Sequence, residues 1–194
     1  MSRTLYFQFL FNLALCLVLV GCAAKEKSVV WTAYNVSFAD YKVLEVRPVV
    51  NATNRSIEQV ILSKFTDQLT ERFAEKALPL TDSTEITSGV LIVQTDLIVY
   101  EDYKYEHVYG VYGSTGWVET RCSLRTRLVD KANNHIVAEI STVKVASAEG
   151  LGSIPVYFGS PLVTAADIHE EVLNKAVSAI AEEVAKLMAP KEPG

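Results

Sequence analysis

The chain of 194 residues has little of what marks the special classes of protein. It contains three cysteines, six prolines and nine glycines, and 21% of its residues are charged. So few cysteines exclude a disulfide-rich scaffold, and the composition excludes collagen, coiled coil and a disordered chain. The net charge of −5 leaves no basic excess to neutralise phosphates, so we expect no nucleic-acid partner. With 49% hydrophobic residues, the composition is that of one ordinary folded domain.

The one long apolar run lies at the start of the chain. Arg3 gives a weakly positive beginning, and a mostly apolar stretch follows from Leu5 to Val20. A membrane-spanning helix needs about 20 apolar residues, whereas this run is shorter and is interrupted by Gln8 and Asn12. The order is typical of a secretory signal peptide, which we predict over residues 1–21.

The leader ends on Leu19-Val20-Gly21-Cys22, and these four residues resemble the lipobox of bacterial lipoproteins. The resemblance implies cleavage after Gly21 and acylation of the Cys22 sulfur and of the new amino terminus. Several acyl chains would hold the protein durably, because each buried methylene contributes roughly 0.8 kcal/mol. Ala23 after the cysteine implies sorting to the outer membrane in Gram-negative relatives, so the expected location is the periplasmic side of that membrane. The alternative is an ordinary signal peptide with a coincidental cysteine.

After the leader we expect one domain and no interdomain linker. Residues 22–28 form the lipid anchor and a short polar tether, residues 29–189 a single α/β domain, and residues 190–194 a tail. A domain of about 160 residues is large enough to bury its own core.

The strand patterns come in two kinds. Branched residues over 41–47, ending before Pro48, predict one strand, and the almost continuously apolar stretch 89–100 predicts a central one. Residues 117–130 alternate between apolar and charged side chains, which predicts a half-buried strand. Turn residues 130–134 should join it to a partner strand over 135–145, forming an antiparallel hairpin.

Two segments have the periodicity of amphipathic helices. Ser56-Ile57-Glu58-Gln59 has the form of a capping box, so the first helix should begin there. Its apolar stripe comprises Ile57, Ile61, Phe65, Leu69 and Phe73. The last helix should begin within 164–167 and end before Pro190. Its stripe comprises Ile168, Val172, Ala176, Ile180, Val184 and Leu187.

Two helices that each need a surface to cover, together with mostly consecutive strands, predict an α+β fold. We expect a two-layer sandwich in the order β-α-β-β-β-α, with a mostly antiparallel sheet covered by two amphipathic helices. A small additional strand is expected early, within residues 29–37.

The sequence carries no recognisable catalytic set. His169-Glu170 begins a zinc-protease pattern, but the residue four positions after the histidine is Leu173. The glycine-flanked serine of hydrolases is missing as well. Cys122 lies in the middle of a predicted strand, so we expect an inert buried thiol. We therefore expect no enzyme, no metal and no cofactor.

Tyrosines cluster between residues 100 and 112. Five of the nine lie within thirteen residues, and alternation on an extended chain would place Tyr103, Tyr105 and Tyr109 on one face. Tyrosine is frequent in recognition surfaces, because it offers a large contact area with few rotatable bonds. We predict a partner-binding segment that includes Tyr103, Tyr105, Tyr109 and Tyr112. The alternative is that these rings pack against the sheet or under a helix.

A second candidate for partner binding is the segment from Ala146 to Val163. It is rich in glycine and proline and is expected to be a long loop, of the kind that often carries function. Tyr157 and Phe158 at its centre are apolar for a loop. They either fill a gap in the core or contact a partner.

Arg121, Arg125 and Arg127 point to one face of the alternating strand. They could bind an anionic ligand, or they could form a solvated face that is partly paired with Glu119 and Glu139.

The lipobox together with this element order resembles a group of small bacterial outer-membrane lipoproteins. The group includes many uncharacterised families, the lipoprotein partner of the lipopolysaccharide-assembly protein, and lipoproteins of the curli-secretion-channel type. The resemblance implies a non-enzymatic, lipid-anchored binding or scaffold protein with an envelope protein as partner. The alternative function is a lipid or lipopolysaccharide carrier, in which the three arginines bind anionic head groups.

Overall fold

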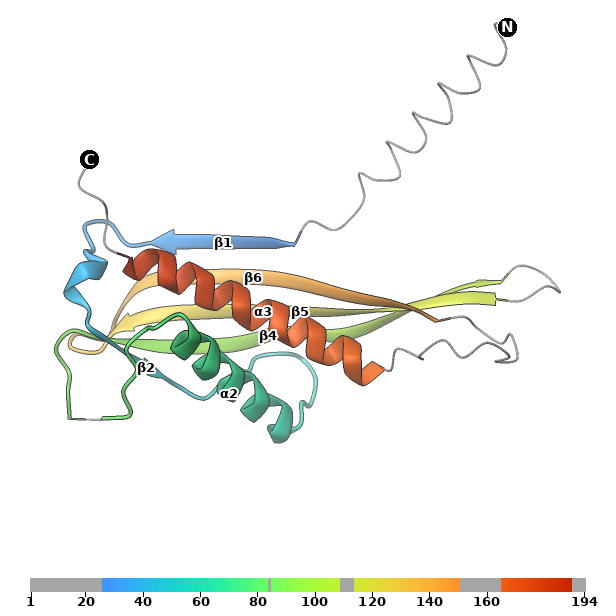
Figure 1. Ribbon diagram of the computed structural model, residues 1–194, viewed down its shortest axis with the longest axis horizontal. Helices are drawn as coiled ribbons and strands as arrows, with labels where there is room; N and C mark the ends of the chain where they lie inside the picture. Colours follow the sequence, from blue (N-terminus) through green and yellow to red (C-terminus); the bar gives the residue numbers. More distant parts are fainter. Residues whose placement is uncertain (1–25, 84, 109–113, 151–164, 190–194) are drawn as a thin grey trace, which may run out of the picture.

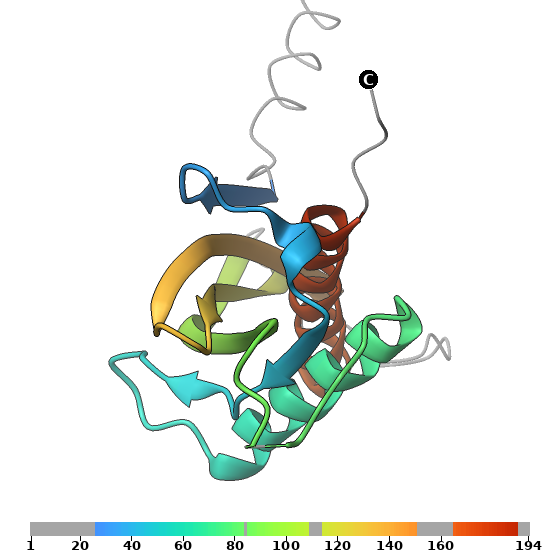
Figure 2. The same cartoon turned by 90° about the vertical axis from the view of Figure 1, so that its left-hand side faces the viewer.

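The computed structural model describes residues 26–83, 85–108, 114–150 and 165–189. The elements in chain order are β1 (Lys27–Thr32), the short 3-10 helix η2 (Phe38–Asp40), β2 (Val43–Val46), β3 (Val50–Asn51), α2 (Gln59–Glu75), β4 (Val90–Val108), β5 (Ser114–Asp130), β6 (His135–Gly150) and α3 (Ala165–Met188). Six strands form one sheet, and both long helices lie on the same face of it (Figures 1 and 2). The predicted α+β two-layer sandwich is confirmed.

The sheet is mixed but mostly antiparallel. Its order is β1-β6-β5-β4-β2, and β3 also pairs with β4. The pairs β1–β6, β6–β5 and β5–β4 are antiparallel, whereas β2 and β3 run parallel to β4. The parallel pairs arise because α2 returns the chain along one face before β4 begins. β4 lies inside the sheet, as predicted, and β1 forms one edge.

The central strands are longer than predicted. β4 and β5, with β6 paired to β5 as far as Gly116, extend past the helices (Figure 1); we call this extension the β4–β5 arm. The expectation of a loop beginning at Ala146 is wrong, because β6 continues to Gly150, which pairs with Gly116 of β5. Gly116 therefore belongs to a strand as well. A glycine can remain in a strand when the neighbouring strand offers backbone groups for it to pair with. The residues next to the glycine in sequence do not reveal that neighbour.

The turn between β5 and β6 has the predicted chemistry. The Asp130 carboxylate accepts hydrogen bonds from the backbone N–H of Ala132 and the side-chain amide of Asn133, both at 2.9 Å. Asn134 adopts a positive φ of 59°, which asparagine tolerates well. The Tyr41 hydroxyl also donates to Asp130, at 3.2 Å, which ties the turn to the start of β2.

The helix α2 begins later than the capping-box pattern predicts. The chain stays extended through Glu58, which is the N-cap residue and forms no side-chain capping bond. The backbone carbonyl of Glu58 accepts the first helical bond, from Ile61 N–H at 3.0 Å. Ile57 packs against the core from this extended segment, which holds Ser56 outside the capping position.

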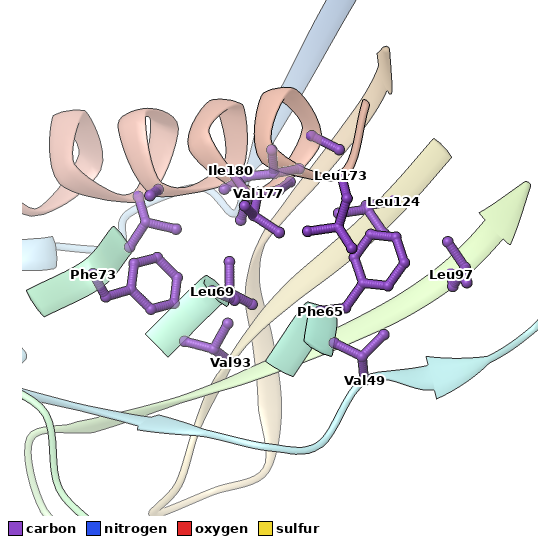
Figure 3. Packing of buried hydrophobic residues seen from close by; sticks show 14 of the residues in the cluster. Val49, Phe65, Leu69, Phe73, Val93, Leu97, Leu124, Leu173, Val177 and Ile180 are labelled. Atoms are coloured by element: carbon purple, nitrogen blue, oxygen red, sulfur yellow. The ribbon is translucent and has the colours of Figure 1, made fainter. Parts of the chain in front are cut away.

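The core lies between the two helices and one face of the sheet. Phe65, Leu69 and Phe73 of α2 are fully buried, and Ile57 and Ile61 pack partly against them. Figure 3 shows these phenyl rings and Leu69 facing Leu173, Val177 and Ile180 of α3 above the sheet. The predicted stripe of α3 is confirmed: Ile168, Val172, Ala176, Ile180 and Val184 are at most 3% exposed, and Leu187 is partly buried.

A β-bulge in β4 decides which side chains reach the helices. The pairing with β5 shifts between Leu97 and Val99, which leaves Ile98 as an extra residue. Before the bulge Leu91, Val93 and Leu97 face the core, and after it Tyr100 faces the core. The odd-numbered residues beyond the bulge therefore lie on the opposite face.

Candidate functional site

The face of the sheet opposite the helices carries the predicted arginines; we call it the outer face. In β5 the helix-facing residues Cys122, Leu124 and Leu128 are at most 1% exposed. The side chains of Arg125 and Arg127, which alternate with them, are 43% and 31% exposed. The alternation predicted for a half-buried strand is therefore confirmed at these positions.

Each arginine of the row has a carboxylate partner. The Arg121 guanidinium contacts Glu119 Oε1 at 2.6 Å, as predicted, and lies 4.6 Å from the centre of the Tyr103 ring. Arg125 and Arg127 do not pair with Glu119. Both donate to Asp96 Oδ2, at 3.0 and 2.9 Å, from positions across the strand pair. The Asp96 side chain is 10% exposed, so the two guanidiniums share one nearly buried counter-ion.

The expected pairing with Glu139 is not seen. Glu139 lies opposite Arg127 in the register, but among the described residues the carboxylate that binds Arg127 is Asp96. β4 places Asp96 directly opposite Arg125, and Arg127 is two residues further along the same face of β5. In the sequence Asp96 interrupts the almost continuously apolar stretch 89–100. This interruption is the signal that could have marked Asp96 as a residue with a specific partner.

A small hollow with a mixed polar and apolar lining adjoins this cluster. It has a volume of about 230 Å³ and its lining includes Arg47, Gln94, Asp96 and Arg127. Arg47 itself pairs with Glu45 at 2.6 Å, and Glu45 also pairs with Lys131 at 2.8 Å. Pockets that enclose drug-sized ligands span about 300–1,000 Å³ and are mostly apolar. The hollow is therefore smaller than a site that encloses a drug-sized ligand.

The tyrosine cluster is divided between the two faces. The Tyr100 ring packs edge-on against Phe65 with 5.7 Å between ring centres, and burial raises the pKa of its hydroxyl to about 12. Tyr103 lies on the outer face, where its hydroxyl donates to Glu101 Oε2 at 2.8 Å. Tyr105 lies in β4 opposite Trp117. The remaining predicted partner-binding residues, Tyr109, Tyr112, Tyr157 and Phe158, lie outside the described residues, as does Cys22.

The fold brings together a histidine and an aspartate that the sequence separates by 67 positions. His169 Nε2 in α3 lies 2.8 and 3.0 Å from the two carboxylate oxygens of Asp102 in β4. Thr120 donates to the same carboxylate at 2.7 Å, and the Tyr100 ring lies 5.4 Å from the imidazole. Within the described ranges no serine or cysteine is hydrogen-bonded to His169. The arrangement ties α3 to the sheet, and in the part of the chain that is described no nucleophile beside His169 completes a hydrolytic triad.

Cys122 is a fully buried thiol, as predicted. Burial raises the pKa of its thiol to about 12 and keeps it protonated at neutral pH. Across the parts of the chain that are described, no three side chains of His, Cys, Asp or Glu gather closely enough to hold a metal ion. The helices of those same parts are not long and apolar enough to cross a membrane.

The buried thiol makes stability depend on pH in the alkaline range. In the unfolded chain the Cys122 thiol ionises near 9.0, whereas in the folded chain it stays protonated up to about 12. Its contribution is complete below pH 9 and is lost as the pH rises toward 12, by about 1.4 kcal/mol per pH unit. We expect the free energy of unfolding, measured with urea at pH 8 and pH 10, to fall more for the wild type than for Cys122→Ala. Equal losses in the two proteins would contradict this.

Comparisons with known proteins give structural likenesses only. No protein-family model and no curated protein sequence matches the chain. The PelC dodecamer from Paraburkholderia phytofirmans is similar over 86% of this chain and 99% of its own, at 10% identity and a TM-score of 0.46. A putative neuraminyllactose-binding hemagglutinin homolog from Helicobacter pylori covers 78% of this chain and 87% of its own, at 12% identity and 0.45. Lipoprotein GNA1162 from Neisseria meningitidis covers 74% and 98%, at 12% identity and 0.37.

Proposed function

We propose that the protein is a non-enzymatic lipoprotein of the bacterial cell envelope. Acyl chains on Cys22 hold it to the periplasmic side of the outer membrane, where the folded domain serves as a binding or scaffold module. The observation that carries this proposal is the Leu19-Val20-Gly21-Cys22 sequence, which stands four residues before the first described residue, Glu26. The pairing of His169 with Asp102 and the protonated state of Cys122 agree with a role that needs no catalytic nucleophile.

The chain offers matched controls for the test of the lipid anchor. We expect Cys22→Ser to abolish incorporation of an alkyne-labelled fatty acid and to leave an uncleaved precursor. Cys16→Ser in the leader and Cys122→Ser in the core should still incorporate the label. The measurements are in-gel detection of the label and mass spectrometry of the mature amino terminus. Unchanged labelling of Cys22→Ser would refute the proposed anchor.

The partner surface that we propose is the outer face of the β4–β5 arm. Tyr103 lies there beside Arg121, and the predicted residues Tyr105, Tyr109 and Tyr112 follow along the same chain segment. The loop residues Tyr157 and Phe158 are proposed to contribute to the same binding. The arm extends beyond the helices, so a partner could reach it without displacing the core (Figure 1).

Loss of the tyrosine rings should abolish binding to an envelope partner. We expect the double variant Tyr103→Ala and Tyr105→Ala to lose at least tenfold in crosslinking yield to that partner in intact cells, since aromatic anchors dominate interfaces. Val60→Ala is the control, because Val60 is 66% exposed on α2, which covers the opposite face of the sheet. Circular dichroism verifies the fold of both variants. An undiminished yield in the double variant would exclude this surface.

The second candidate function, a carrier of lipid or lipopolysaccharide, has one supporting observation. The Nε atoms of Arg125 and Arg127 are buried and have no hydrogen-bond partner, so they could donate to an anionic head group. Against it, α2 and α3 cover the apolar face of the sheet and leave no room there for acyl chains. Lipid that co-purifies with the protein and is lost in the triple variant Arg121→Ala, Arg125→Ala, Arg127→Ala would favour the carrier function.

A further inference from the structure

The edge of the sheet next to the predicted anchor carries exposed apolar side chains on the outer face. Val29 and Trp31 of β1 are 53% and 54% exposed, and Val143 of β6 is 44% exposed. In the register Trp31 lies opposite Glu139, Val29 opposite Ser141 and Lys27 opposite Val143. Directly opposed residues of antiparallel strands share a face, so all three apolar side chains lie on the same side of the sheet. We call Val29, Trp31 and Val143 the edge patch.

The side chains of the edge patch do not face the helices. Val30, which alternates with Val29 and Trp31, lies opposite the fully buried Ile140 and so points to the helix side. The residues of the edge patch point the other way, and among the described elements β6 is the main neighbour of β1. Large apolar groups that gather on an open face usually mark a surface that contacts something else.

The length of chain before β1 limits what that surface can contact. Cys22 and Lys27 are separated by five peptide units, which span at most about 17 Å when fully extended. Trp31, nine residues from Cys22, lies within about 31 Å of it along the chain. If acyl chains enter the bilayer at Cys22, β1 is therefore confined to the zone beside the lipid head groups.

We propose that the edge patch rests in the head-group region of the membrane to which Cys22 is attached. This inference rests on the proposed lipid anchor. Tryptophan is enriched at this depth of membranes, because its ring is apolar while its N–H can be hydrated. Three half-exposed side chains bind a bilayer weakly by themselves, but a short tether maintains a millimolar effective concentration of the surface. The outer face of the sheet would then be turned toward the membrane beside β1, and the β4–β5 arm continues past the Lys27 end of β1, which is the end nearest to Cys22.

The charges around the edge patch do not by themselves require anionic lipid. Glu139 lies between Trp31 and Arg127 in the register, and Asp96 neutralises one of the guanidiniums of Arg125 and Arg127. Apolar contact and the tether are therefore the expected causes of binding, and zwitterionic phosphatidylcholine vesicles are a sufficient probe.

The two tryptophans of the chain permit a direct test. The mature lipoprotein with Trp117→Phe, in which Trp31 is the remaining tryptophan, is reconstituted into phosphatidylcholine vesicles whose acyl chains are brominated near the head group. We expect at least a twofold loss of Trp31 fluorescence relative to unbrominated vesicles, and a shift of its emission to shorter wavelength. The matched variant Trp31→Phe, which retains Trp117, should lose much less fluorescence. Replacing Val29 and Val143 with serine should reduce the loss for Trp31 while the protein stays bound to the vesicles.

Each remaining outcome is decisive. Mass spectrometry of the same preparation shows whether Cys22 is acylated, and an unmodified Cys22 would refute both the anchor and this inference. An acylated protein whose Trp31 is equally bright in both kinds of vesicle and fully accessible to acrylamide would refute this inference alone. A shifted emission without lipid quenching that grows with protein density would assign the edge patch to a second copy of the chain and would likewise refute membrane contact.

Discussion

Replacing Phe65 with alanine is expected to lower the free energy of unfolding by about 3–5 kcal/mol. The Phe65 side chain is fully buried, and its ring joins three elements: it lies on α2, packs edge-on against Tyr100 of β4, and through Tyr100 is one contact away from His169 of α3. Removing the ring leaves a cavity between tightly packed layers that the surrounding residues can fill only in part. Urea denaturation measures the loss.

The chain offers graded controls for Phe65. Phe65→Leu retains much of the volume and should cost less than half as much as Phe65→Ala. Val60→Ala, on the same helix but 66% exposed, should change stability by no more than about 0.5 kcal/mol. If Phe65→Ala cost as little as Val60→Ala, the helix would not pack on the sheet in the way described.

Replacing Asp96 with asparagine is expected to have the second largest effect, a loss of about 1–3 kcal/mol in the free energy of unfolding. Asparagine keeps the volume of the side chain but removes the charge that Arg125 and Arg127 share at 3.0 and 2.9 Å. Two guanidiniums then face each other across a short stretch of β5 without a counter-ion. Because these guanidiniums remain partly exposed, solvent screens them, and the loss is smaller than for a fully buried pair.

A double-mutant cycle isolates this interaction. Arg127→Gln in the Asp96→Asn background should restore part of the lost stability, because it removes one of the two opposing charges. Asp67→Asn, at an exposed position of α2, controls for the loss of one negative charge and should be nearly neutral. If the losses from Asp96→Asn and Arg127→Gln simply added, the shared counter-ion would have no energetic role.

The regular features of the fold could be predicted because they are periodic in sequence. The alternation assigns the side chains of residues 118–128 in β5 to the correct faces, and the four-residue stripes identify the buried faces of α2 and α3. Both signals report burial, which is the dominant free energy in folding. The order of elements follows from them, including the position of β4 inside the sheet.

The contacts that the sequence does not reveal depend on register and on distance along the chain. Glu119 was predictable as the partner of Arg121, since the two residues share a face of one strand. Asp96 was not predictable as the partner of Arg125, because that contact requires knowledge of how β4 aligns with β5. The pair of His169 and Asp102 joins a helix to a strand 67 positions apart, and no local pattern carries it. The exposure of Trp31 likewise follows from the position of β1 at the edge of the sheet.

The single extra residue at Ile98 has a consequence for how β4 can change during evolution. Leu97 pairs with Leu124 and Val99 with Ser123, which are consecutive residues of β5, so Ile98 has no partner of its own in that strand. Deleting Ile98 would close the bulge into a regular ladder and leave Tyr103 on the outer face and Asp102 on the helix side. A one-residue deletion elsewhere in residues 90–102 can also be absorbed by closing the bulge, but the residues between the gap and Ile98 then exchange faces. In related chains, one-residue gaps should accordingly fall at or next to position 98, and a gap farther away should coincide with an exchange of polar and apolar positions between it and the bulge.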